Sequence, residues 1–331
     1  MISCKYGVND IFLDVTEIVI KTFKRGDSLY FPKGNKQFNN YFTDPCVNIT
    51  KQLIINNDSK TLIIEDNDEN EYILDNISFA QINKSIKISV VLNAYKRLQH
   101  LDEQINAVIN QTIKPSEIII WNNSEKELDI NINLYSVPII IFTSSKNLGV
   151  WARFFAAFNC NGEYIAVFDD DTIPGNQWFE NCLNCMSIKE GLYGTSGSRF
   201  SNQGYLAGSQ REGWLNGNDN IEEVDIIGHA WFFKREWLKY YVNDLPDTEQ
   251  FKLMGEDLHL SYTFKKYGGI RSYIAKHPRN NLSLYGSIKG WQYGTESVAL
   301  SSLPGAYVRF EIAYQHWVNK LGHSLVNYEK K

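Results

Sequence analysis

Long hydrophobic runs are missing from this sequence, and no stretch approaches the ~20 apolar residues that a helix needs to span a bilayer. Residues 1–7 contain no apolar segment of the kind that a secretory signal requires. Cysteine is sparse, and an odd set of five makes a poor disulfide framework. These absences predict a cytoplasmic protein that has no transmembrane segment.

An excess of basic residues is also missing, because the formal net charge is −5. A protein that binds duplex nucleic acid normally presents a basic face, so we expect no nucleic-acid partner. A single nucleotide is not excluded, since it needs only a few local cations. The composition, with 43% hydrophobic and 14% aromatic residues, is that of an ordinary globular protein.

The first 82 residues are typical of a small, mainly β domain. Residues 11–20 are rich in β-branched side chains. Two apolar runs at 53–55 and 62–64 flank a polar stretch, which predicts a β-hairpin. The polar residues 81–85 are the expected linker to a second, larger domain.

From residue 86 to residue 331 the pattern changes to strands that alternate with helices. This pattern predicts an α/β domain with a mostly parallel, Rossmann-like sheet and helices on both faces. In such sheets ligands bind beyond the carboxyl ends of the strands. The expected strands are residues 88–92, 117–121, 137–142 and 164–168, and the expected helices between them are residues 101–109 and 152–158.

Three adjacent carboxylates, Asp169, Asp170 and Asp171, come directly after the last of these strands. Their mutual repulsion is relieved by a divalent cation, and hard oxygen ligands suit Mg²⁺ or Mn²⁺. A solvated acidic turn that caps the next helix is the alternative interpretation. The position at a strand end, where the binding crevice is expected, favours the metal site.

Four segments in order resemble glycosyltransferases of the GT-A fold. Residues 89–97 (SVVLNAYKR) are similar to their first strand and nucleotide-binding loop. Residues 147–153 (NLGVWAR) and 162–171 (GEYIAVFDDD) resemble their helix and D-x-D strand, and residues 255–261 (GEDLHLS) resemble their late Glu-Asp motif. The resemblance implies a GT-A fold and a transferase that uses a nucleotide sugar.

Two groups within that superfamily compete. The segments at 147–149 and 255–258 resemble family 2 enzymes, which invert the anomeric centre. Residues 121–123, 168–172 and 226–233 resemble the exostosin-type family 64 enzymes, which retain it. Both outcomes stay open, because Trp121-Asn-Asn stands where family 2 usually has an acidic residue.

The resemblance also implies residue roles. Asp171 and Asp169 would hold Mn²⁺ or Mg²⁺, with His277 as a third ligand or a phosphate contact. Asp257 would take the proton of the acceptor hydroxyl if the reaction inverts. The candidate contacts to the nucleotide sugar are Ala94, Tyr95, Arg97, Asn122, Asn147, Arg153, Asp169 and Asp170. The candidate contacts to the acceptor are Arg211, Trp214, His229 and Glu256.

Each role has a structural alternative. A salt-bridged surface residue is the alternative for Arg153, and a turn residue is an equal alternative for Asn123. Glu256 and Asp257 also suit a helix N-terminus, where the dipole favours carboxylates. Trp214, Trp291 and Tyr293 are aromatic faces that suit sugar rings, but such residues are also common in cores.

Residues 6–46 of the first domain resemble a β-domain found at the C-terminal end of certain J-domain co-chaperones. Packing, homo-oligomerisation or acceptor docking is its expected role. The whole chain is therefore predicted to be a metal-dependent glycosyltransferase that moves a sugar, with a UDP-linked donor expected, to a glycan or glycoconjugate. A nucleotidyltransferase and a non-catalytic carbohydrate-binding or assembly module are the alternatives.

Overall fold

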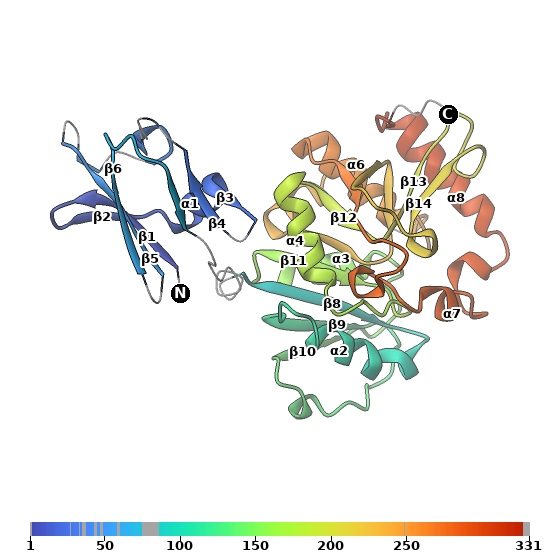
Figure 1. Cartoon of the computed structure of the whole chain (residues 1–331). Helices are drawn as coiled ribbons and strands as arrows, with labels where there is room; N and C mark the ends of the chain where they lie inside the picture. The colour runs from blue at the N-terminus through green and yellow to red at the C-terminus, as the bar shows by residue number, and fades with distance from the viewer. Residues whose placement is uncertain are drawn as a thin grey trace. The chain divides into compact units, whose positions relative to one another are not determined.

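A computed structural model of the chain (Figure 1) describes residues 2–26, 28–32, 34, 38–42, 45, 46, 49–57, 60–74, 86–247 and 249–326. The chain divides into two compact units, Met1–Ile86 and Lys87–Lys331. The expected linker at 81–85 lies outside the described residues. Among the helices of the described part, none combines the length and the apolar character needed to cross a membrane.

The described part of the first unit is mainly β. Its four-stranded antiparallel sheet has the order β2-β1-β5-β6, and a three-stranded sheet has the order β3-β4-β7. The pairing of β5 with β6 confirms the predicted hairpin. The strands are β1 (Ser3–Val8), β2 (Ile11–Asp14), β3 (Lys24–Arg25), β4 (Ser28–Phe31), β5 (Gln52–Asn57), β6 (Lys60–Glu65) and β7 (Tyr72–Leu74).

The β-branched stretch at 11–20 is only partly a strand, which corrects the sequence-based expectation. The strand ends at Asp14, and helix α1 (Thr16–Phe23) comes next. The Asp14 carboxylate accepts hydrogen bonds from the backbone N–H of Thr16 (3.0 Å) and from its hydroxyl (2.6 Å). Val19 and Phe23, one helical turn apart, are both buried. Helical spacing of buried side chains therefore outweighs β-propensity here.

The second unit contains an eight-stranded mixed sheet of the order β10-β9-β8-β11-β17-β12-β18-β15. Strands β10, β9, β8 and β11 are parallel to one another, whereas β17 and β15 run antiparallel to their neighbours. The four expected strands are confirmed, with small shifts at their ends. The strands are β8 (Ile88–Ala94), β9 (Glu117–Asn122), β10 (Ile139–Thr143), β11 (Tyr164–Phe168), β12 (Leu192–Gly194), β15 (Glu222–Val224), β17 (Trp231–Lys234) and β18 (Ser272–Ile274).

The order of the strands creates a crevice next to β8. The chain moves outward from β8 to β9 and β10, and then returns to place β11 on the other side of β8. The connections that follow β8 and β11 leave the sheet in opposite directions. They therefore move apart at the carboxyl ends of these two strands. Ligands of open α/β sheets bind at such a switch point.

Both faces of the central strands are covered. Val90, Val91 and Leu92 are fully buried although their side chains alternate between the two faces of the sheet. Ile165 to Phe168 in β11 are fully buried as well. Continuous burial of this kind is the pattern of a parallel sheet between helical layers, so the expected α/β class is confirmed.

Short helices and a second small sheet complete this unit. The helices are α2 (Leu101–Ile109), α3 (Ala152–Ala156), α4 (Trp178–Ile188), α5 (Leu238–Tyr241), α6 (Glu256–Gly268), α7 (Gly290–Gly294) and α8 (Ala306–Tyr314). The three-stranded antiparallel sheet has the order β14-β13-β16 and consists of β14 (Gln210–Gly213), β13 (Ser196–Arg199) and β16 (Ile226–Gly228).

Glycine is required where α6 begins. Gly255 has a φ of +82°, and a Cβ placed there would lie 2.3 Å from the ring of Trp317. The close approach of Trp317 lets its indole N–H donate to Nδ1 of His259 (3.1 Å). The other imidazole nitrogen, Nε2, donates to the carbonyl of Tyr241 (2.8 Å). His259 is therefore neutral in the folded protein, because its Nδ1 must accept.

Acid should destabilise the second unit through His259. Burial lowers the pKa of His259 to about 4, so the unfolded chain, with a pKa of about 6.5, binds the proton more readily. The contribution to stability is complete above pH 6.5 and is lost as the pH falls toward 4. We expect His259→Gln to reduce the pH slope of the unfolding free energy in this window by roughly 1.4 kcal/mol per pH unit.

Tryptophan fluorescence can follow this unfolding selectively, because all eight tryptophans lie in the second unit. Denaturant titrations between pH 4 and pH 7 would measure the slope for both proteins. An unchanged slope in the variant would contradict a neutral, buried His259.

Candidate functional site

A pocket of about 770 Å³ lies at the switch point of the large sheet. Its wall includes residues that come after β8, the acidic triplet after β11, and residues of the three-stranded sheet. The first turn of α6 and the segment around α7 also contribute. The side chains that carry charge into the pocket are Lys96, Arg97, Arg153, Asp169, Asp170, Asp171, Arg211, Glu256 and Asp257.

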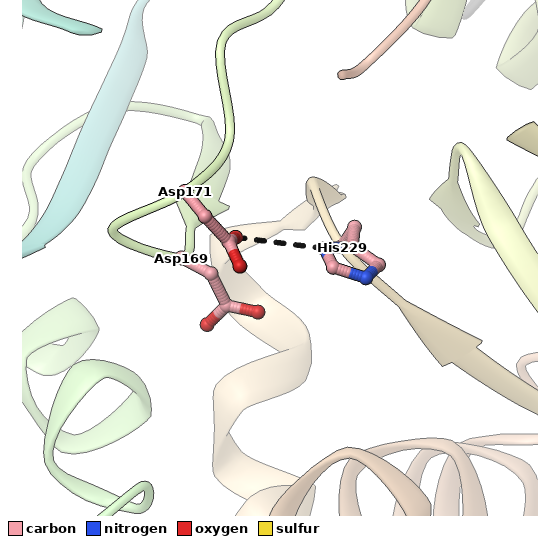
Figure 2. A group of neighbouring side chains, drawn as sticks. All are labelled: Asp169, Asp171 and His229. Atoms are coloured by element: carbon pink, nitrogen blue, oxygen red, sulfur yellow. Dashed lines mark ion pairs between the residues drawn. The ribbon is translucent and has the colours of Figure 1, made fainter. Parts of the chain in front are cut away.

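Asp169, Asp171 and His229 form a group of ligand atoms that could hold a metal ion (Figure 2). One ligand atom from each residue lies within 4.8 Å of the others. His229 Nδ1 is 3.8 Å from Asp171 Oδ1, and this buried nitrogen has no hydrogen-bond partner in the described part of the chain. Two carboxylates and an imidazole are a suitable ligand set for Mn²⁺.

The backbone holds His229 in this place at a conformational cost. His229 and Ala230 have φ values of +58° and +55°, in the left-handed region that residues other than glycine rarely adopt. They form the tight turn between β16 and β17. A Cβ on Gly286 would approach that of Ala230 to 2.7 Å, so a glycine is required beside the turn. Such strain persists where the surrounding structure enforces it, and it is common at functional sites.

Arg97 neutralises one side of the triplet. Its guanidinium lies 2.5 Å from Asp170 Oδ1, 3.6 Å from Asp171 Oδ2 and 3.3 Å from Glu296 Oε2. Burial, together with the charges of Asp171 and Asp169, raises the pKa of Asp170 to about 6 even though Arg97 opposes the shift. The acidic cluster is therefore costly to ionise completely, and another cation would lower that cost.

Arg153 links the triplet to α6. Its Nε lies 3.2 Å from Asp169 Oδ1, and its terminal nitrogen lies 2.6 Å from Glu256 Oε1. The guanidinium also packs over the ring of Trp231 at 4.8 Å. Arg153 is 5% exposed, so the surface salt bridge considered as its alternative role is wrong. It is a buried cation shared by two carboxylates.

Asp257 differs from the other carboxylates of the pocket, because no cationic side chain of the described residues pairs with it. Its Oδ1 accepts the backbone N–H of Leu258 (2.7 Å) at the start of α6. Burial and the neighbouring charge of Glu256 raise the pKa of Asp257 well above its usual range. Glu256, in contrast, is held by Arg153. Of the two, Asp257 has the properties of a proton acceptor.

Aromatic rings and Arg211 also line the pocket. Trp214 is 8% exposed, and its ring contacts Arg211 (4.7 Å) and His229 (5.0 Å). Trp291 is 60% exposed and packs edge-on against Trp214. Trp214 therefore supports its neighbours, whereas Trp291 offers an open face. Tyr293 does not line the pocket, because it stacks on His100 and donates to Glu103.

The expected contacts after β8 and β9 are partly corrected. Tyr95 and Arg97 line the pocket, but Ala94 is buried at the end of β8 and does not. Asn122 is fully buried, and its amide holds the turn by bonding Lys126 and Ser124. Asn123 lines the pocket instead. Of these two asparagines, Asn123 is thus the one that lines the pocket.

Asn147 lines the pocket as expected, and its position depends on Asn123. The amide of Asn123 donates to Asn147 Oδ1 (2.8 Å), which also accepts the backbone N–H of Gly149 (2.8 Å). Asn123 Oδ1 accepts the N–H of Leu148 (2.8 Å). The two asparagines therefore fix the loop that leads to Arg153.

His277, expected as a third metal ligand or a phosphate contact, lies outside the group of Asp169, Asp171 and His229. It is fully buried, its Nδ1 donates to the carbonyl of Ala275 (2.6 Å), and its ring packs edge-on against Tyr285. It does not line the pocket. His229, expected from the sequence to contact the acceptor, occupies the place near Asp171 instead.

Glu296 was not recognised in the sequence. It pairs with Arg97 and, at 2.9 Å, with His100. Gly294, two residues earlier, lies so close to Asp171 that a Cβ there would be 3.3 Å from its Oδ2. Nothing in the local pattern around residue 296 indicates this contact, because it depends on chain segments almost 200 residues apart.

The mainly parallel sheet, its switch-point pocket and the acidic residues after β11 define an α/β protein of the GT-A class. Comparison with known proteins agrees with this class. Residues 89–242, just under half of the chain, match the family described as Glycosyl transferase family 2.

Curated proteins that are similar to part of this chain are named as glycosyltransferases. An uncharacterized glycosyltransferase of Haemophilus influenzae is 33% identical over 101 residues, which cover 29% of this chain and 31% of that protein. The uncharacterized glycosyltransferase YwdF of Bacillus subtilis is 34% identical over 95 residues, covering 28% and 35%. The matched segment thus spans about a third of the length of these curated relatives.

Solved structures show a more distant likeness. The crystal structure of Staphylococcus aureus TarS 1–349 in complex with UDP is 16% identical, with a TM-score of 0.41. The match covers 58% of this chain and 60% of that one. A likeness at this level says nothing of the donor or the acceptor of the present chain.

Substitution of the two histidines should separate the geometric assignment from the sequence-based one. We expect His229→Gln to weaken Mn²⁺ binding at least about tenfold, since loss even of an outer-shell partner typically costs that much. His277→Gln should leave Mn²⁺ affinity unchanged. Isothermal titration with MnCl₂ would measure both. Weaker binding in the His277 variant alone would contradict the assignment.

Proposed function

We propose that this chain is a metal-dependent glycosyltransferase that moves a sugar from a nucleoside diphosphate, with UDP as the favoured carrier, to a hydroxyl of a glycan or glycoconjugate. The observation that carries this proposal is the group Asp169, Asp171 and His229 at the switch point of the sheet. Arg97 and Arg153 flank this group. The family match over residues 89–242 supports the proposal.

The donor half of the reaction requires neutralisation of charge on a departing diphosphate. Mn²⁺ or Mg²⁺ held by Asp169, Asp171 and His229 would supply this charge stabilisation. Tyr95, Asn123 and Asn147 line the part of the pocket that would receive the base and ribose. Arg97 and Arg153 are already engaged by carboxylates, so their role is to keep the triplet in place as much as to meet the donor.

The acceptor half requires a base, and we propose Asp257. The acceptor oxygen attacks the anomeric carbon while its proton passes to the Asp257 carboxylate. The bond between the anomeric carbon and the diphosphate oxygen breaks at the same time. A single displacement of this kind inverts the anomeric centre. The raised pKa of Asp257 supports the assignment, because it makes this carboxylate a stronger proton acceptor than an ordinary aspartate.

The first unit remains without an assigned chemistry. We propose packing, homo-oligomerisation or acceptor docking as its role, in keeping with the resemblance of residues 6–46 to a non-catalytic β-domain. A chain that lacks residues 1–86 and still transfers sugar at an unchanged rate would exclude acceptor docking.

A panel of nucleotide sugars would test the proposed function. In the presence of Mn²⁺, one or a few donors should raise the melting temperature and be hydrolysed slowly to the nucleoside diphosphate. Release of pyrophosphate from a sugar phosphate and a nucleoside triphosphate would indicate a nucleotidyltransferase instead. Failure of every nucleotide sugar to bind would refute the proposal.

Asp257→Asn should abolish most of the turnover and leave the donor site intact. Removal of a general base typically costs about 10²–10⁴-fold, so we expect kcat to fall at least about a hundredfold. The dissociation constant of UDP should change less than about twofold. The wild-type rate should rise with pH as Asp257 loses its proton, and the variant should lack this rise.

Glu249→Gln removes a carboxylate from an exposed position in the same region and serves as the control. The rate of donor hydrolysis would be measured across the pH range for the wild-type protein, Asp257→Asn and Glu249→Gln. A full rate in Asp257→Asn would remove this residue from catalysis.

A further inference from the structure

Three arginines line the pocket, and one of them differs from the others in its surroundings. Arg97 and Arg153 each contact two or more carboxylates within 4.0 Å. Arg211 forms no ion pair with a carboxylate among the residues that the structure describes. The side chain of Arg211 is exposed, whereas those of Arg97 and Arg153 are buried among their carboxylates. Arg211 is therefore a solvent-exposed cation of the pocket wall whose charge no carboxylate of the described residues compensates.

The guanidinium of Arg211 is held in a defined orientation. Arg211 lies on β14 opposite Ser198 of β13, and its Nε lies 3.3 Å from the hydroxyl of Ser196. Its flat face packs on the ring of Trp214 at 4.7 Å. Contacts through Nε and through one face leave the two terminal nitrogens for a ligand. A planar fork with two such nitrogens suits a carboxylate or a phosphate.

The position of Arg211 points to the acceptor side of the pocket. Burial raises the pKa of the neighbouring Tyr205, and the charges of Asp257 and Glu256 add to this shift while Arg211 opposes it. Arg211 thus lies in the region of the proposed base. The ring of Trp214 contacts both Arg211 and His229, and His229 in turn lies beside Asp171.

The negative charge of the pocket indicates a role for Arg211. Five carboxylates line the pocket, namely Asp169, Asp170, Asp171, Glu256 and Asp257. An acceptor with a negative charge would be repelled from the base unless a cation met that charge locally. A neutral acceptor would require no such cation.

We propose that the acceptor carries an anionic group, a carboxylate or a phosphate, and that Arg211 binds this group through its two terminal nitrogens. Arg211 thereby places the neighbouring hydroxyl of the acceptor near Asp257. The exposed ring of Trp291 contributes an apolar face beside it. This inference rests on the proposed glycosyltransferase function and narrows its acceptor class.

Paired probes with and without an anionic group would test the inference. Methyl glucuronide with methyl glucoside tests a carboxylate, and glycerol 3-phosphate with glycerol tests a phosphate. Binding to the whole chain, saturated with Mn²⁺ and UDP, would be measured by isothermal titration calorimetry. We expect the anionic member of at least one pair to bind roughly tenfold to a hundredfold more tightly, and less so at high salt.

Arg211→Gln should abolish the preference for the anionic probe, and Arg211→Lys should restore only part of it because the fork is lost. Arg271→Gln serves as the control, because Arg271 is an exposed arginine paired with Glu223 outside the pocket. The affinity for UDP with Mn²⁺ should stay within about twofold in all three variants, which also shows that they fold.

Three results would overturn the inference. Equal or absent binding of the anionic probes would show that the acceptor site does not select charge. A preference that persists in Arg211→Gln would assign it to another residue. Loss of UDP affinity in Arg211→Gln would place Arg211 at the donor diphosphate. Failure of the proposed function itself is distinct from these, because the wild-type protein would then bind no UDP with Mn²⁺.

Discussion

Repulsion between carboxylates is the constraint around which the pocket is organised. Asp169, Asp170 and Asp171 enter it from one strand end, and Glu256 and Asp257 enter from the first turn of α6. Charges of one sign at such close range cannot all be ionised and dehydrated without a partner. Arg97 and Arg153 provide part of the compensation, and both are buried beside the carboxylates. We propose that a cation held beside His229, whose Nδ1 has no hydrogen-bond partner among the described residues, provides the rest.

The topology of the sheet explains why these groups meet. Adjacent parallel strands β8 and β11 end at the same edge, so the residues after them face one crevice. The left-handed turn at His229 then adds an imidazole from the antiparallel side of the sheet. Gly255 fixes the start of α6, which brings Glu256 and Asp257 to the pocket. Only a glycine tolerates both the φ at this position and the nearby ring of Trp317. Backbone strain and close packing thus serve to position charge.

Much of this arrangement is predictable from sequence, because periodicity and position are local properties. The apolar runs ending at Leu92 and Phe168 indicate buried parallel strands, and the triplet after Phe168 is conspicuous for its charge. The choice between Asn122 and Asn123, and between His277 and His229, is not local. It depends on which way a turn rotates a side chain and on contacts between distant segments. The helix at Thr16–Phe23 was not predicted, again because packing decides the outcome. Burial of Val19 and Phe23 outweighs the β-propensity of this segment.

The central claim is that a divalent cation joins the acidic cluster to a nucleoside diphosphate. Calorimetric titration of UDP into the wild-type protein, once with Mn²⁺ and once with EDTA, tests it most directly. The account predicts binding at least about tenfold tighter with Mn²⁺, since the cation neutralises both the cluster and the diphosphate. Asp171→Asn should remove most of this difference. Equal affinity for UDP with and without Mn²⁺ would contradict the account.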